Sequence, residues 1–318
     1  MFGKLGRALD RAAFRPYSLP ADMALGIALI PPLVAGLTLY GLIAFVSAVL
    51  ALAMGGAFHL LARRAKIPLR SSPAITAFIG VALVGAGAHI VWSLLIAVLA
   101  SLLELLRGRF WPRAGIHTGL IAYAFAYWTS SGTVATYLKP VVLVPFPEPI
   151  QQWSRFYGGD ARFIDPTTLY VGNVAGPILC TSLLAVVISI AWLWYARRVS
   201  LAALIGFLLG GLLISVMLRW DPVFQLDSGP TWFVAALALA DRRLLPEEPV
   251  LRPTLAFAAG VFAVGVRAVP LYIEGVFLSV AALQVAFALL ELGTRWLTPR
   301  LPRLFKRGQS RRREPASA

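Results

Sequence analysis

Residues 72–87 read SPAITAFIGVALVGAG, and residues 229–240 read GPTWFVAALALA. Both stretches follow a Ser and carry a Pro at or near their start, and both are shorter than the roughly 20 apolar residues with which a helix crosses a bilayer. Short, Pro- or Gly-interrupted spans in matching places of two halves are typical of transport-type membrane proteins with inverted repeats and a midplane site. The pair therefore predicts a membrane protein that moves something across a bilayer.

The amino-acid composition indicates the same class of protein. Apolar residues make up 59% of the 318 residues, which leaves too little polar surface for a soluble globule. The sequence predicts an all-α polytopic membrane protein, because helices satisfy their own backbone groups in lipid. Ten apolar spans are expected, near residues 20–40, 44–62, 72–87, 90–106, 115–129, 174–196, 201–218, 229–240, 254–269 and 271–293.

The basic residues fix the expected orientation. If the N-terminus is cytoplasmic, all but five of the 29 Lys and Arg residues fall on cytoplasmic loops and tails. This bias follows the positive-inside rule and predicts a multi-pass protein of the cell membrane with both termini cytoplasmic. The net charge of +15 is thereby explained without nucleic acid as a partner.

The ten spans divide into two halves of five. Because five is odd, the second half must enter the membrane from the opposite side, so any repeat is inverted. Pro73 and Pro230 are separated by nearly the same interval as Gly119 and Gly275, which supports a repeat, although Gly and Pro are common in membrane helices anyway. The expected organisation is a first repeat at 1–129, an external connecting loop at 130–171, a second repeat at 172–294 and a basic cytoplasmic tail at 295–318.

Several short motifs resemble one family. They are Leu19 to Tyr40, Ala122-Tyr123-Ala124-Phe125, Gly172-Asn173-Val174-Ala175-Gly176, Leu239-Ala240-Asp241 and Tyr272-Ile273-Glu274-Gly275-Val276. In order and spacing they resemble the RnfD/NqrB family, the membrane subunits of the Rnf complex and of the sodium-pumping NADH:quinone oxidoreductase, over about residues 18–293. The resemblance implies ten helices in two inverted halves, a urea-transporter-like fold, and flavin-mediated electron transfer coupled to sodium or proton movement, with flavoprotein and iron–sulfur subunits as partners.

The chain departs from the family at the flavin attachment site. The family binds FMN through a Thr in a Ser-Gly-Ala-Thr stretch, whereas the corresponding residues here, 163–169, read FIDPTTL. Thr168 is the remaining attachment candidate, and Asn173 and Thr181 are candidate contacts to a cofactor. The alternative for Asn173 and Thr181 is that they cap or join helices. We expect a divergent paralogue in which FMN or another flavin is bound noncovalently or has been lost.

Ionisable residues inside apolar spans are candidates for ion coupling, since a charge in hydrocarbon is costly unless it faces a partner or a cavity. Glu274 lies in the tenth span, and its alternative is a helix-start acid after Pro270. Asp22 begins the first span, and its alternative is a helix-start acid beside Arg15. Asp241 ends the eighth span, where either a partner such as Arg242 or Arg243 or a cavity role must offset the unfavourable helix dipole.

Other chemistry is not expected on this chain. Cys180 is the single cysteine, so the chain cannot ligate an iron–sulfur cluster by itself. The three His residues do not share a helical face, and neither a phosphate loop nor a zinc spacing is present, so no catalytic residue and no metal site is assigned.

The leading hypothesis is an integral subunit of a flavin-dependent, ion-translocating electron transport complex, with its site where the two short spans meet. One alternative is a stand-alone channel or carrier for a small solute on the same inverted fold. Another is a scaffold subunit that has no redox role and docks partners through residues 130–171.

Overall fold

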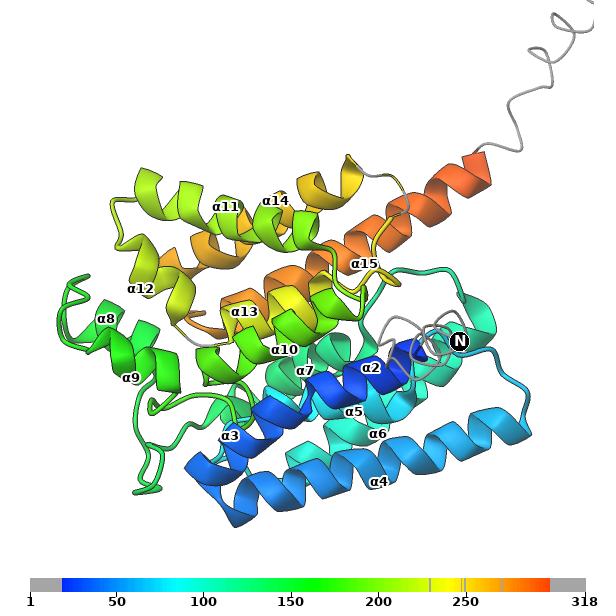
Figure 1. Ribbon diagram of the computed structural model, residues 1–318, viewed down its shortest axis with the longest axis horizontal. Helices are drawn as coiled ribbons and strands as arrows, with labels where there is room; N and C mark the ends of the chain where they lie inside the picture. The colour runs from blue at the N-terminus through cyan, green and yellow to red at the C-terminus, as the bar shows by residue number, and fades with distance from the viewer. Residues whose placement is uncertain (1–18, 229, 247, 249, 270, 298–318) are drawn as a thin grey trace, which may run out of the picture.

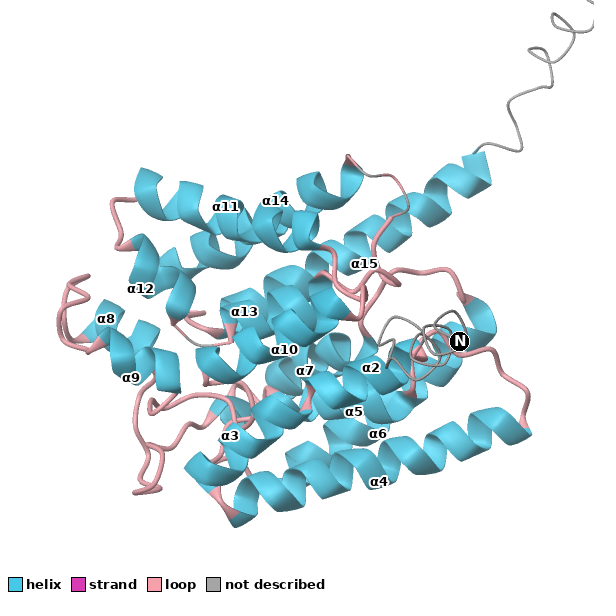
Figure 2. Ribbon diagram, viewed as in Figure 1, coloured by secondary structure: helices cyan, strands magenta, loops and turns pink. Residues whose placement is uncertain are grey.

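The structure is a computed structural model that describes residues 19–297 except 229, 247, 249 and 270. Among the described residues helices are the regular secondary structure, joined by loops, and there is no strand; isolated bridges are their only extended pairings (Figure 2). The all-α prediction is therefore confirmed for this part of the chain. Gly229, which begins the second short stretch, Pro270, and the basic segments at 1–18 and 298–318 lie outside the described residues.

Each apolar span of the first half contains helix. The helices are α2 (Ala21–Ala28), α3 (Ile30–Tyr40), α4 (Leu42–Arg64), α5 (Pro73–Ala82), α6 (Ile90–Phe110) and α7 (Thr118–Thr129). α2 and α3 together form one apolar stretch of 20 residues. Gly41 separates α3 from α4 with a φ of 58°, a conformation that glycine adopts without strain.

The second half follows a connecting segment with short helices of its own. In chain order the elements are η2 (Thr133–Ala135), α8 (Pro149–Arg155), α9 (Pro166–Val171), α10 (Leu183–Tyr195), α11 (Leu201–Met217), α12 (Pro222–Asp227), α13 (Thr231–Phe233), η3 (Val234–Leu239), α14 (Leu251–Gly265), η4 (Val266–Ala268) and α15 (Glu274–Leu297).

The protein is a multi-pass membrane protein. Within the described residues, five helical stretches are long and apolar enough to cross a bilayer, namely Ala21–Tyr40, Leu42–Arg64, Ile90–Phe110, Leu251–Ala268 and Glu274–Gly293. Their outward faces carry large apolar side chains, of which Leu42 is 74% and Leu289 62% exposed. In water, apolar surface on this scale would drive association, whereas in lipid it is the expected surface.

The bundle has two distinct ends (Figure 1). α8, α9 and α12 lie together at one end, where the indole of Trp153 in α8 packs edge-on against Trp220 at 5.0 Å. We call this the α8 end. At the opposite end, which we call the basic end, the Arg243 guanidinium donates to the Arg70 carbonyl at 2.9 Å, and the Arg70 guanidinium donates to the carbonyl of Arg113.

The two short stretches run in opposite directions. α5 begins at the basic end next to Ser71, whereas α13 begins at the α8 end after α12. α5 and η3 are almost entirely buried, and the aromatic side chains Phe78 and Phe233 belong to one continuous apolar core. Because their own side chains are covered by protein, these two elements line the centre of the bundle and do not face lipid.

Two sequence predictions are wrong in detail. The span predicted at 174–196 becomes helical only at Leu183, because Pro177 lacks an amide hydrogen and the backbone beside it pairs with the end of α5, where Ile178 N donates to the Val84 carbonyl at 2.8 Å. The segment at 130–171 was expected to be a connecting loop. It contains short helices as well, because Pro149 and Pro166 begin α8 and α9, and the first helical position does not need an amide hydrogen.

Candidate functional site

A buried polar cluster lies at the α8 end, where α15 begins. Glu274 is only 5% exposed, and its Oε1 accepts a hydrogen bond of 2.7 Å from the hydroxyl of Tyr137 in the connecting segment. The ring of Tyr123 in α7 packs edge-on against Phe277, one turn along α15, at 5.2 Å. Glu274 is thus both the first residue of its helix and a carboxyl enclosed by protein. Its position is compatible with both interpretations from the sequence, an ionisable group in an apolar span and a helix-start acid.

Glu148 is a second buried carboxyl of this cluster, and sequence analysis did not identify it. It caps α8, where its oxygens accept from the amides of Ile150 and Gln151 at 2.7 Å each. Burial, and then the nearby charge of Glu274, raise the pKa of Glu148 from its ordinary value to about 8. The position before Pro149 at the start of a helix was the available sequence signal, because acidic residues cap helices there.

Arg267 supplies the positive charge of the cluster. It lies near the end of the span predicted at 254–269 and was not a site candidate, yet its side chain is only 2% exposed. Its guanidinium donates to Gln225 Oε1 at 3.0 Å and to Thr231 Oγ1 at 2.8 Å, and also to the Gln225 carbonyl. These acceptors are neutral, and Arg267 forms no ion pair with a described carboxylate, although the charge of Glu148 attracts it from farther away. Two carboxyls, one guanidinium and a phenol in a dry environment can hold and exchange a proton.

Asp241 and Asp22 come together at the basic end around a single arginine. Arg243 donates to Asp22 Oδ1 at 2.6 Å and to Asp241 Oδ2 at 2.8 Å. Although burial lowers it, the two carboxylates raise the pKa of Arg243 above its ordinary value. Both acids therefore face a permanent cation that joins the start of α2 to the segment after η3. Arg15, the partner expected for Asp22, lies outside the described residues.

We expect Arg243→Ala to lower the stability of the protein by about 1–3 kcal/mol, because Asp241, which is nearly buried, loses its counter-charge. Thermal unfolding of the purified protein in detergent measures the effect. Arg242→Gln is the matched control, since the guanidinium of Arg242 donates to the Val199 carbonyl and forms no ion pair with a described carboxylate. Equal melting temperatures for the two variants would show that the Asp241 pair does not stabilise the fold.

A fully buried ion pair lies inside α6 and was also not predicted from the sequence. Glu104 is fully buried, and its Oε1 accepts from Arg107 Nη2 at 2.5 Å and from the Ser71 amide at 3.1 Å. Its Oε2 accepts from the Thr118 hydroxyl at 3.2 Å. The pair joins α6 to the beginnings of α5 and α7. An acid and a base three residues apart inside an apolar helix could have revealed it.

The candidate cofactor residues are only partly brought together. Thr168 is half-buried in α9, and its carbonyl accepts from the amide of Asn173 at 3.0 Å, so these two share one surface turn. Thr181 is 3% exposed and lies in the segment beneath Tyr40, whose hydroxyl donates to the carbonyls of Val174 and Gly176. The structure thus groups Thr168 with Asn173 and places Thr181 in the core.

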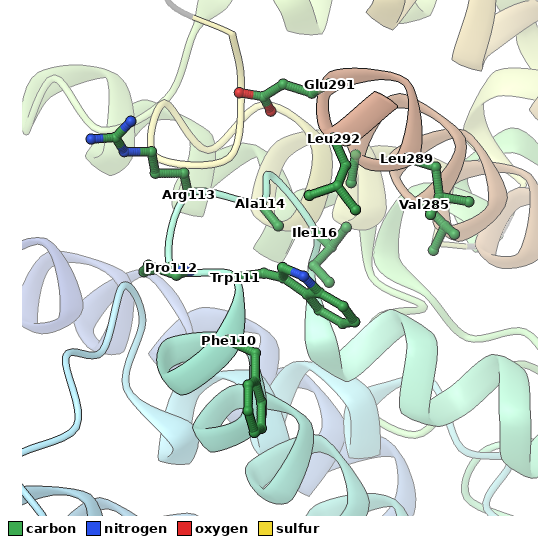
Figure 3. A pocket seen from close by; sticks show the side chains of 11 residues that line it. Phe110, Trp111, Pro112, Arg113, Ala114, Ile116, Val285, Leu289, Glu291 and Leu292 are labelled. Atoms are coloured by element: carbon green, nitrogen blue, oxygen red, sulfur yellow. The ribbon is translucent and has the colours of Figure 1, made fainter. Parts of the chain in front are cut away.

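The basic end also carries an apolar groove of about 480 Å³ between the loop after α6 and the last turns of α15 (Figure 3). Phe110 and Trp111 line one side and Leu289 and Leu292 the other. Elsewhere, within residues 19–297 as described, no group of three His, Cys, Asp or Glu side chains could hold a metal ion. Cys180 is a free, buried thiol.

Comparison with known proteins gives one match. A family model described as the NQR2, RnfD, RnfE family matches residues 21–295. This match begins with α2, covers both short helices and ends in α15. No curated protein matches the chain.

Proposed function

Because the chain belongs to the NQR2, RnfD, RnfE family, we propose that it is the flavin-dependent, ion-translocating membrane subunit of an Rnf- or Nqr-type electron transport complex. The family match over residues 21–295 carries this proposal. Membership makes the chain a membrane subunit of such complexes in general. The finer proposal adds the fold symmetry, the flavin, the ion and the partner subunits, which would include flavoprotein and iron–sulfur proteins.

The proposed architecture is ten helices in two inverted repeats, with a urea-transporter-like fold. The opposite directions of α5 and α13 support it. The contacts at the carboxyl ends of the two short helices support it as well. The Val84 carbonyl after α5 accepts a hydrogen bond from the Ile178 amide before α10, and the Ala240 carbonyl after η3 accepts one from the Ser200 amide after α10. The basic end then faces the cytoplasm with both termini, as the positive-inside rule predicts.

The proposed flavin is FMN or a related flavin held without a covalent bond. The turn that joins Thr168 to Asn173 supports a contact near the surface of the α8 end. A covalent phosphoester to Thr168 would place the flavin at the same turn. Thr181 is buried beneath Tyr40, so its contact to a flavin would have to be made from the core side of this segment.

We expect the protein, purified with its complex, to absorb in the flavin bands. On denaturation the flavin should be released into the soluble fraction, and its absorbance should appear there. Retention of the flavin on the denatured chain, with loss of the signal in Thr168→Val, would instead indicate covalent attachment at Thr168. A colourless complex would contradict the redox function. Solute uptake into liposomes by the isolated, colourless chain would then favour a channel or carrier.

Glu274 is the proposed coupling residue for the ion, because it is the carboxyl enclosed at the start of a membrane-spanning helix. Asp241 and Asp22 are proposed to act on coupling through Arg243. Their ion pairs hold the segment after the second short helix against the start of the first helix, so they set the geometry of the core.

A further inference from the structure

A hairpin in the connecting segment exposes an apolar tip. Leu138 pairs with Pro145, and the stretch 140–147 between and beyond them reads PVVLVPFP, without a charged or hydrogen-bonding side chain. We call residues 137–146 the apolar hairpin and residues 141–144 its tip. Val141 and Val142 are 74% and 62% exposed, and the rest of the tip is exposed as well. A contiguous apolar surface of this kind marks contact with a membrane or another protein.

The backbone amides of the tip are satisfied by the chain itself. Three of them donate to carbonyls, namely Val141 to Leu39 at 3.0 Å, Val142 to Pro140 at 2.7 Å and Leu143 to Lys139 at 2.9 Å. The two prolines of the hairpin have no amide hydrogen to satisfy. In an apolar medium backbone donors must find partners within the protein, because the medium offers none. The tip meets this condition at each of the three amides.

The turn positions of the tip carry apolar side chains although glycine would fit there more easily. Val141 has a φ of 67° and Leu143 a φ of 56°. Glycine, asparagine and aspartate adopt such conformations readily, whereas a β-branched residue such as valine rarely does. The sequence therefore places exposed apolar side chains at positions that favour small or polar ones. An apolar medium around the tip gives these side chains a favourable environment.

The tip lies where the lipid-facing surface of the bundle begins. Leu39, which accepts from the Val141 amide, belongs to the last turn of α3, at the end of the membrane-spanning stretch Ala21–Tyr40. The next span starts at Leu42, one of the most exposed apolar side chains of the protein. In Figure 1 the turn between α3 and α4 lies on the side of the bundle that carries α8 and α9. The apolar surface of the tip thus continues the lipid-facing surface of these two spans.

The base of the hairpin carries a cation beside an aromatic ring. The ammonium of Lys139 lies 5.5 Å from the ring centroid of Phe146, and both residues are exposed. Lysine side chains extend from an apolar surface to the headgroups, and aromatic rings gather at the same level of a bilayer. A protein partner is less well matched, since protein interfaces combine apolar contacts with regular hydrogen bonds. The side chains of the tip have no hydrogen-bonding group, and its amides are already paired.

We propose that the apolar hairpin inserts its tip into the bilayer leaflet at the α8 end, at the level of the headgroups and beside the turn between α3 and α4. Its partner is lipid and not another subunit. The insertion also holds the base of the hairpin, where Tyr137 accepts from the Phe146 amide and donates its hydroxyl to Glu274. The connecting segment is thereby fixed to the membrane surface and to α15. This inference does not rest on a flavin or on ion translocation.

The test is fluorescence quenching of the full chain in lipid nanodiscs, which leave both faces of the bilayer accessible. Val142→Cys and Val144→Cys are each labelled with a small thiol-reactive fluorophore. Arg162→Cys is the matched control on the same segment, because that side chain is 92% exposed. The unsubstituted chain, whose Cys180 is a buried thiol, gives the labelling background. Lipids brominated near the headgroup end of the acyl chain report contact with lipid, and iodide reports contact with water.

We expect brominated lipid to quench both tip labels several-fold more than the Arg162→Cys label, and iodide to quench them several-fold less. Equal responses at the tip and at the control would overturn the proposal. Iodide access to the tip that is lost only when other subunits of a complex bind would overturn it in favour of a protein docking surface. Because the isolated chain is measured without a cofactor, a colourless complex would contradict the proposed function and leave this result unaffected.

Discussion

Gly55→Leu is expected to prevent assembly of a folded protein, whereas Gly56→Leu is tolerated. A Cβ on Gly55 in α4 would overlap Ala74 Cα and lie 2.7 Å from the Pro73 carbonyl oxygen. These atoms belong to the backbone at the start of α5, so they cannot move aside as a flexible side chain could. A Cβ on Gly56 meets nothing within 4 Å.

The physical reason is the way that membrane helices associate. Small residues let two backbones approach closely, and much of the packing energy in lipid comes from that approach. Overpacking costs about 1–3 kcal/mol even where side chains can adjust, and more where the backbone blocks the way. At Gly56 the substitution improves helix propensity by up to about 1 kcal/mol and adds only a side chain on an open face.

Size-exclusion chromatography and thermal unfolding in detergent compare the two variants. We expect Gly56→Leu to elute as the wild type and to melt within a few degrees of it, and Gly55→Leu to aggregate or to be absent from the membrane fraction. If both variants behave alike, the close approach of α4 to α5 does not govern folding.

Arg107→Leu is the second substitution with a large expected effect. It removes the cation that bonds Glu104, a fully buried carboxylate, and leaves that charge among apolar side chains. Breaking one partner of a buried pair typically costs about 3–5 kcal/mol. Glu104→Leu/Arg107→Leu removes both charges, so it should be less destabilising than Arg107→Leu despite being the larger change.

Asp160→Asn is the control for this comparison. Its carboxylate pairs with Arg162 at 3.2 Å, but the two side chains are 52% and 92% exposed. Such exposed pairs contribute little because both charges stay hydrated and are screened by salt, so the melting temperature should hardly change. A double variant that is less stable than Arg107→Leu would show that the hydrogen bonds to Ser71 and Thr118 outweigh the isolated charge.

The apolar spans could be predicted because hydrophobic composition is local information. Every predicted span contains helix, and the two short stretches are short in the structure, where α5 has 10 residues and α13 with η3 has nine. The residues at which helices begin were harder to predict than the spans themselves. The span expected from residue 174 begins at Leu183, because its first residues pair with the end of α5, which lies far away in the sequence.

The site residues stay predictions, and the structure shows how they are placed. Glu274 could be singled out from the sequence because a lone carboxylate in an apolar span is conspicuous, and its side chain is buried. Glu148 and Arg267 were not found, because each lies in a polar or boundary segment that is exposed in most proteins. The fold buries them by packing the connecting segment and η4 against the start of α15.

By itself the sequence determined the class of the protein, its helical spans and the paired short stretches, since these depend on the composition of continuous segments. Only the tertiary structure decided which charges meet. Arg243 joins Asp22 to Asp241, and Glu274 accepts a hydrogen bond from Tyr137, in both cases between segments more than a hundred residues apart. Burial and charge pairing arise from packing between distant segments, and the free energy of a buried charge depends on those neighbours and not on its own position in the chain.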